Sequence, residues 1–395
     1  MQQAPVLSGS ARRLVPRVQA IDVVRGLAMV VMALDHTREF WSPTLVRPED
    51  VAQASALLFL TRWVTYFCAP TFVFLSGASV YLYQQKQAGR GVVSRFLLTR
   101  GLWLVALEVL VVSWLLHWDY HLILFQVIWV IGWGLVALAG LIWLPRWLLA
   151  AVALVIIAGH DLLPAIQPVT AATLGPALLH NGPFLYTAAA LPPVLVAYSI
   201  GPWLGVMLAG YLLGPWLLLP LFQRIRRLRW TGAGLLLLFG VLRATNWYGD
   251  PSPWSSQARG ILYSVLSFVN VTKYPPSLLF DCLTVGVALL LLSGAENAPA
   301  YRWGRWLRTY GQVPFFYYLL HLALLSGGAW GWTHVAFGQP VNFSFSDPKE
   351  WPPAYAPSLL RAYTVWLTVV LLLYGPCRWY QRYKQQHTHW WLSYL

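Results

Sequence analysis

Four ionisable residues occur within one short stretch of an apolar segment: Asp35, His36, Arg38 and Glu39. Imidazole accepts and releases a proton near neutral pH without much tuning, so His36 is a candidate general base. A neighbouring carboxylate orients or polarises such a ring, and Asp35 is adjacent in sequence. We therefore treat His36 and Asp35 as candidate catalytic residues, with helix packing as the competing interpretation.

The same apolar segment, residues 19–40, carries a second polar pair nearer its start. An α-helix advances 100° per residue, so it places Asp22, Arg25 and His36 within an arc of about 60°. Asp22 and Arg25 are three residues apart and are spaced to pair with each other. Helix anchoring explains that pair, although a guanidinium at this position also suits a phosphate.

Further polar side chains lie at membrane depth or on the same predicted side as His36. A charged group at the centre of a membrane helix costs about 2.5 to 3.5 kcal/mol or more, so it needs a partner, water or a function. Glu108 and His321 lie near the predicted midplane and either pair with each other or line a hydrated passage. The candidate substrate-binding residues are Arg38, Asn246, Asp250, Asn270, Lys273 and His321. A solvated loop is the competing interpretation for any single loop residue.

Other chemistries have weaker support. The sequence has no HExxH, CxxC or comparable ligand spacing, so no metal site is expected. It also has no P-loop or dinucleotide GxGxxG fingerprint. Three cysteines cannot form a disulfide framework in a chain of 395 residues. A thiol nucleophile at Cys68 is kept as a minor alternative to a histidine base.

The composition requires these residues to be positioned by membrane helices. The chain is 58% hydrophobic and 10% charged, whereas soluble proteins carry about a quarter charged residues. Apolar stretches of about 20 residues are long enough to cross a bilayer as helices. We therefore predict an all-α, polytopic transmembrane bundle of ten or eleven helices. The ten stretches are 19–40, 57–82, 97–117, 122–144, 146–163, 195–219, 230–246, 276–293, 310–333 and 358–377, and 184–194 is the candidate eleventh.

The net charge of +14 follows from this topology. With ten helices, one set of loops and termini holds 18 Lys and Arg residues and the opposite set holds five. The positive-inside rule then places both termini in the cytoplasm. Basic clusters such as residues 224–229 meet anionic lipid headgroups, and nucleic-acid binding is not expected. The chain is predicted to be one domain over 1–395, with basic cytoplasmic segments at 1–18 and 378–395.

The opposite set of loops is longer and rich in Pro and Gly. Loops of this length in a compact protein usually shape a site, although plain connection between helices is the competing interpretation. They cover residues 41–56, 164–194, 247–275 and 334–357.

Six segments together resemble the catalytic-domain family of heparan-alpha-glucosaminide N-acetyltransferase, in particular its compact bacterial branch. The resemblance covers nearly the whole chain, and its first segment has D, RG and DH at fixed offsets. The segments are IDVVRGLAMVVMALDHTREF from Ile21, FLTRWVTYFCAPTFVFLSGASVYL from Phe59, LLTRGLWL from Leu97, NVTKYPPSLLF from Asn270, GQVPFFYYLLHLAL from Gly311, and the terminal WWLSYL.

The resemblance implies a multi-pass acyltransferase of the bacterial cytoplasmic membrane. Such an enzyme moves an acetyl group from cytoplasmic acetyl-CoA to an amine or hydroxyl of an extracytoplasmic sugar. The family's first-helix motif maps onto Asp22, Arg25, Gly26, Asp35 and His36. The lysosomal members do not keep the DH pair and add a lumenal region without a counterpart here. A cell-envelope glycan or lipid-linked sugar is therefore the expected acceptor, rather than heparan sulfate.

A basic cytoplasmic mouth suits the anionic end of acetyl-CoA. The candidate donor-binding residues are Arg25, Asp22, Lys86, Arg90, Arg95 and Arg100. In the resulting scheme His36 is the general base and Asp35 orients it, while Asn246, Asn270 or Lys273 stabilises the oxyanion. Direct transfer needs no metal.

Two other functions remain open from the sequence alone. A transporter or flippase also has many helices and charged residues at depth, although no inverted repeat is visible. A non-catalytic membrane assembly protein would use the polar face of the first helix for packing. Membrane lipids are expected partners in every case. The acceptor, the acyl length and the oligomeric state, a homo-oligomer included, are undetermined.

Overall fold

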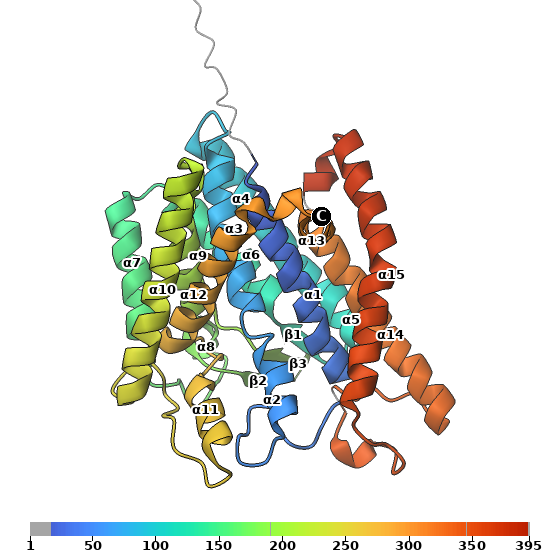
Figure 1. Cartoon of the computed structure of the whole chain (residues 1–395). Coiled ribbons are helices and arrows are strands. Elements are labelled where there is room, and N and C mark those ends of the chain that lie inside the picture. Colours follow the sequence, from blue (N-terminus) through green and yellow to red (C-terminus); the bar gives the residue numbers. More distant parts are fainter. Residues whose placement is uncertain (1–16, 190, 345, 394–395) are drawn as a thin grey trace, which may run out of the picture.

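The computed structural model describes residues 17–189, 191–344 and 346–393 and forms a bundle of helices with one small sheet (Figure 1). Most of the predicted basic segment 1–18, including Arg12 and Arg13, therefore lies outside the described residues. The helices are α1 (Gln19–Trp41), α2 (Ala56–Trp63), α3 (Cys68–Gln84), α4 (Arg90–Leu107), α5 (Ser113–His117), α6 (Val127–Leu141), α7 (Arg146–Gly159), α8 (Leu174–His180), α9 (Ile200–Leu213), α10 (Leu221–Thr245), α11 (Ile261–Val269), α12 (Leu278–Gly294), α13 (Arg302–Gln312), α14 (Pro314–Phe337) and α15 (Leu359–Gln386).

Each of the ten predicted apolar stretches contains a helix, but fewer of them qualify as membrane spans. Among the described residues, five helical segments are long and apolar enough to cross a membrane, or six if α13 and α14, which meet at 84°, count as one span. The five are Ala56–Gln84, Arg90–His117, Ile200–Leu218, Leu278–Ala300 and Leu359–Gln386. The predicted count of ten is therefore not supported. α1 is rich in charge, while α6 and α7 have only 15 and 14 residues.

Residues 184–194, the candidate eleventh span, are not helical. They belong to β2 (Phe184–Ala188) and β3 (Leu191–Val196), which pair in antiparallel fashion. β1 (Ile123–Phe125) pairs in parallel with β3 and completes a sheet of order β1-β3-β2. Pro192 and Pro193 lack the amide hydrogens that a helix interior needs, which explains the strand conformation here.

The two ends of the bundle differ in character. At one end, called here the basic end, α1, α4 and α10 begin and α15 ends (Figure 1). This end carries the arginines of residues 224–229 and 302–308. At the other end, called the loop end, lie the sheet, α2, α8 and α11 (Figure 1). α1 therefore carries Asp22 at the basic end and His36 toward the loop end.

Glycines bring several helix pairs into backbone contact, among them α1 with α13 and α3 with α9. A Cβ added at Gly26 of α1 would collide with the carbonyl of Leu307 in α13. In the pair α3 and α9, a Cβ at Gly77 would meet the carbonyl of Met207, and Gly210 makes the reciprocal approach. Small residues permit such close packing in membranes. These contacts fix α1 against α13 and α3 against α9.

Candidate functional site

Two cavities lie along α1, α3 and the start of α6. The loop-end cavity has a volume of about 340 Å³ and is strongly polar. Its polar lining consists of Asp35, His36, Arg38, Glu39, Arg62, Thr65, Gln126, Tyr198, Lys273, Tyr274 and Ser344. The basic-end cavity has a volume of about 300 Å³ and is mainly apolar. Its polar lining includes Arg25, Ser76, Ser79 and Arg100.

One continuous face of α1 lines both cavities. The lining positions Arg25, Met29, Met32, His36 and Glu39 follow one another at intervals of three or four residues, which is the spacing of a single helix face. Met32 is a lining residue of both cavities, so the two cavities adjoin there. The predicted shared face of Arg25 and His36 is confirmed, and each of these side chains lies in a different cavity.

His36 is hydrogen-bonded to a second histidine, His321 of α14. The distance between His36 Nδ1 and His321 Nε2 is 2.8 Å, and His321 Nδ1 lies 3.0 Å from the carbonyl oxygen of Tyr317. A carbonyl only accepts, so His321 Nδ1 carries the hydrogen and the neutral ring accepts at Nε2. His36 then donates from Nδ1. In a neutral His36, the lone pair is therefore on Nε2.

That Nε2 atom is available for chemistry. Among the residues that the structure describes, no hydrogen bond to His36 Nε2 is recorded, and the ring lines the loop-end cavity. An unprotonated ring nitrogen at a polar cavity is the feature that a general base requires. The geometry thus supports the predicted role of His36 on different grounds from those used with the sequence.

The structure gives His321 and Glu108 different partners from the predicted ones. His321 is fully buried and does not line the loop-end cavity, so it acts on His36 rather than on an acceptor. Glu108 accepts a hydrogen bond of 3.0 Å from the backbone N–H of Gln126 and does not pair with His321. Their positions in the sequence indicated that both side chains lie at a similar depth, but did not indicate the direction in which each side chain points.

Asp35 also has other partners than the predicted one. Its carboxylate accepts hydrogen bonds from Arg38, at 3.2 Å, and from Arg62 of α2. Adjacent residues on a helix do not face each other, which explains why Asp35 does not bond to the ring of His36. Arg62 was not among the candidates. A basic residue within an apolar stretch is the signal that would have identified it.

Lys273 differs from the two arginines of this cavity. Arg38 pairs with Asp35 and Glu39, and Arg62 pairs with Asp35 and with Glu49 at 3.5 Å. In the described part of the chain, Lys273 has no such ion pair, although it is only 9% exposed and lines the cavity. Its charge is therefore available to a bound molecule.

Two tyrosine rings accompany the ammonium group of Lys273. Its nitrogen lies 4.9 Å from the ring centre of Tyr274 and 6.0 Å from that of Tyr66, so cation–π attraction contributes to holding it. Burial acts to raise the pKa of Tyr274, but the positive charges of Lys273 and Arg62 outweigh it and the net shift is downward. The surroundings of Lys273 thus favour negative charge.

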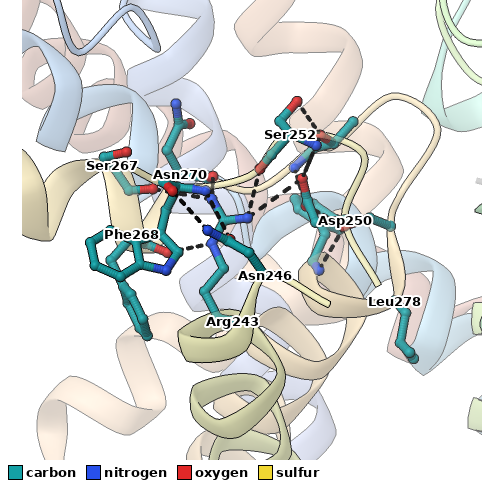
Figure 2. Close-up of polar contacts among 12 residues, drawn as sticks. Arg243, Asn246, Asp250, Ser252, Ser267, Phe268, Asn270 and Leu278 are labelled. Carbon is teal, nitrogen blue, oxygen red and sulfur yellow. Dashed lines mark hydrogen bonds and ion pairs between the residues drawn. The ribbon is translucent and has the colours of Figure 1, made fainter. Parts of the chain in front are cut away.

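A buried polar network holds the loop that carries Lys273 (Figure 2). Arg243, at the end of α10, donates to the carbonyl oxygens of Ser252, Ser267, Phe268 and Asn270. Its guanidinium also lies 3.7 Å from the carboxylate of Asp250. That carboxylate in turn accepts hydrogen bonds from Thr272 and Ser277, on either side of Lys273.

Three of the residues predicted to bind the acetyl acceptor belong to this network and do not line a cavity. Asn246 exchanges hydrogen bonds with the backbone of Trp254, and the side-chain amide of Asn270 donates to the carbonyl of Glu49. Asp250, as described, binds the loop. None of Asn246, Asp250 and Asn270 lines either of the two cavities. Of the predicted oxyanion stabilisers, only Lys273 reaches the loop-end cavity.

The residues predicted to bind the acetyl donor fall into two groups, those that line the basic-end cavity and those that do not. Arg25 and Arg100 line the basic-end cavity, and Arg25 donates to Ser79 Oγ at 3.1 Å and to the carbonyl of Gly311. Asp22 lies behind Arg25, at 3.7 Å, and does not line the cavity. The remaining three candidates, Lys86, Arg90 and Arg95, are exposed and do not line it either.

The position of Cys68 is compatible with a role as a thiol nucleophile, and the described residues form no metal centre. Cys68 lines the loop-end cavity and is buried. No group of three or more His, Cys, Asp or Glu side chains suited to a metal ion occurs within the described ranges.

The long apolar helices and the polar cavity beside His36 define the chain as a helical membrane protein with an internal cavity. Residues 17–244 match the family model of heparan-alpha-glucosaminide N-acetyltransferase, catalytic. This match covers more than half of the chain, so the chain belongs to this family and is a transferase of the acyltransferase kind. No curated protein matches the chain. The matched region includes α1, α3 and α6, which line both cavities.

Proposed function

We propose that this protein transfers an acetyl group from acetyl-CoA, bound in the basic-end cavity, to an amine or hydroxyl of a sugar bound in the loop-end cavity. The observation that carries the proposal is the arrangement of the two adjoining cavities. One holds Arg25 and Arg100, which suit an anionic donor, and the other holds a histidine with an available lone pair. Membership of the acetyltransferase family supports the reaction type.

The basic-end cavity suits both the phosphate groups and the pantetheine arm of acetyl-CoA. Arg25 and Arg100 attract phosphate groups, and the exposed Lys86, Arg90 and Arg95 add positive charge at the same end. The apolar lining, which includes Leu104 and Ile131, offers an environment for the pantetheine arm. The excess of basic residues at this end favours a cytoplasmic position, where acetyl-CoA is available.

The proposed reaction is a direct acyl transfer. The acceptor amine or hydroxyl attacks the thioester carbonyl carbon, and its proton passes to Nε2 of His36. Lys273 stabilises the negative oxygen of the tetrahedral intermediate. The carbon–sulfur bond then breaks, and His36 returns the proton to the sulfur of CoA. The products are an amide or ester of the acceptor and free CoA.

The loop-end cavity is proposed to receive an extracytoplasmic sugar, such as a cell-envelope glycan or a lipid-linked sugar in a bacterial cytoplasmic membrane. Thr65, Gln126 and Tyr198 supply hydrogen-bonding groups of the kind that sugar hydroxyls need. The position of this cavity at the loop end supports an acceptor arriving from the side opposite to acetyl-CoA.

Membranes that contain the protein are expected to incorporate label from radiolabelled acetyl-CoA, and His36→Ala should abolish incorporation while the purified protein stays folded. The matched control is His121→Ala, because His121 is an exposed loop-end histidine paired with Asp119. Equal labelling by His36→Ala and the wild type would overturn the role of His36. Movement of a solute across the membrane without any consumption of acetyl-CoA would favour the transporter alternative instead.

A further inference from the structure

Three apolar residues mark the boundary between the two cavities. Met32 of α1, Phe72 of α3 and Val127 of α6 each line both cavities, and all three are buried. We call this set the waist. Any group that passes from the basic-end cavity toward His36 must pass or occupy the space between these three side chains.

The waist is placed where the acyl group of a bound thioester would lie. Met32 precedes His36 by four residues, so the two side chains are neighbours on one face of α1. If the pantetheine arm occupies the basic-end cavity, the acyl group is the leading end of the donor. The acceptor attacks from the loop-end cavity, so the thioester lies where the two cavities meet and its acyl carbons contact the waist.

The walls that carry the waist have little freedom to move apart. α1 is locked to α13 through Gly26, and α3 is locked to α9 through Gly77 and Gly210, where backbones are in contact. Phe72 lies on α3 only five residues before Gly77. α6, which carries Val127, packs closely against α4 through Gly101 and Gly132. The width of the waist is therefore determined by the three side chains rather than by helix movement.

We infer that Met32, Phe72 and Val127 select the acyl chain, restricting transfer to short groups such as acetyl. This inference rests on the proposed function and adds the acyl specificity of the same site. In an apolar pocket, one methylene changes the relative rates of two substrates by roughly 10- to 200-fold. A butyryl group carries two methylenes more than acetyl, so discrimination against it should be easy to measure.

The test compares acetyl-CoA with butyryl-CoA as labelled donors to a soluble α-glucosaminide and to membranes that contain the full chain. We expect Phe72→Ala to lower the preference for acetyl, as a ratio of kcat/KM values, by about tenfold or more. Val127→Leu narrows the waist and should raise the preference. Ile131→Ala is the matched control, because Ile131 is an apolar lining residue of the basic-end cavity alone.

The two substitutions act in opposite directions, so misfolding of one leaves the other as a test. An unchanged preference in whichever waist variant folds, or an equal change in Ile131→Ala, overturns the inference while the transferase activity itself stands. If the wild type transfers neither acyl group to either acceptor, the proposed function fails and the inference fails with it.

Discussion

His36 and His321 form a pair in which one ring sets the chemistry of the other. The backbone carbonyl of Tyr317 determines which nitrogen of His321 is protonated, and His321 then accepts the hydrogen on His36 Nδ1. The base at the cavity is thus defined by a contact buried behind it. In the proposed reaction His321 therefore has a positioning role, because it contacts His36 and does not line the loop-end cavity.

His321→Leu is expected to lower kcat for acetyl transfer by roughly 100-fold, the lower range of general-base contributions, because the leucine cannot hold the Nδ1–H tautomer of His36. KM for acetyl-CoA should hardly change, since His321 does not line the basic-end cavity. Steady-state kinetics on the purified protein measure both values.

His321→Gln provides the corresponding rescue, since the glutamine side-chain oxygen is able to accept from His36 Nδ1. We expect it to recover part of the lost kcat. In the wild type and in His321→Gln alike, transfer should decline as the pH falls, because protonation of His36 removes the lone pair on Nε2. A KM defect with an intact kcat in His321→Leu would argue against the positioning role.

The loop between α11 and α12 shows how an element without regular structure becomes a firm support. Arg243 donates to four backbone carbonyls, those of residues 252, 267, 268 and 270. Asp250 accepts from donors on residues 272 and 277. Buried backbone carbonyls need partners, and here a single guanidinium supplies them. Lys273 therefore keeps its place against the loop-end cavity.

Asp250→Ala should destabilise the protein by about 3 to 5 kcal/mol, because it leaves the guanidinium of Arg243 buried without its carboxylate. It should also lower acetyl transfer, since the loop then no longer holds Lys273 beside His36. Thermal unfolding in detergent and the labelling assay measure the two effects. Asp347→Ala removes an exposed acidic side chain of another loop and serves as the control. Full stability in Asp250→Ala would contradict the supporting role of the network.

Helical periodicity was sufficient to predict the face shared by Arg25 and His36, because that pattern depends on one helix alone. It was insufficient for the partners of His36, because His321 lies 285 residues away in sequence. Local patterns also failed for Asn246 and Asn270, whose amides satisfy the backbone of distant or irregular segments. The sequence thus predicted that Arg25 and His36 share one face of a helix, but not the contacts that His36 makes with the rest of the chain.

The number of membrane spans illustrates the same limit for whole elements. All ten predicted stretches contain helices, yet hydropathy does not distinguish a helix that crosses a bilayer from one that packs among other helices. α1 is largely buried within the bundle despite its charges, because its polar face points into the cavities rather than toward lipid. Charged residues at depth were thus a better indicator of the site than of the topology.

The unequal ends of the molecule define a direction for the reaction. The cavities proposed for donor and acceptor adjoin inside the bundle, the first lined by Arg25 and Arg100 of the basic end and the second by Lys273 and Tyr274 of the loop end. If the basic end faces the cytoplasm, acetyl-CoA need not cross the membrane. In the proposed reaction only the acyl group, held at the waist, is transferred to the acceptor in the loop-end cavity.

This direction is tested by introducing one cysteine at each end, because Cys68, Cys282 and Cys377 are all buried and should react little with an impermeant thiol reagent. Asp119→Cys, at an exposed position of the loop end, should be labelled in intact cells. Arg95→Cys, at an exposed position of the basic end, should be labelled only after the membrane is opened. The wild-type chain reports the background of the buried thiols. The reverse labelling pattern would place the donor cavity on the side that lacks acetyl-CoA, and transfer across the membrane in the proposed direction would then be wrong.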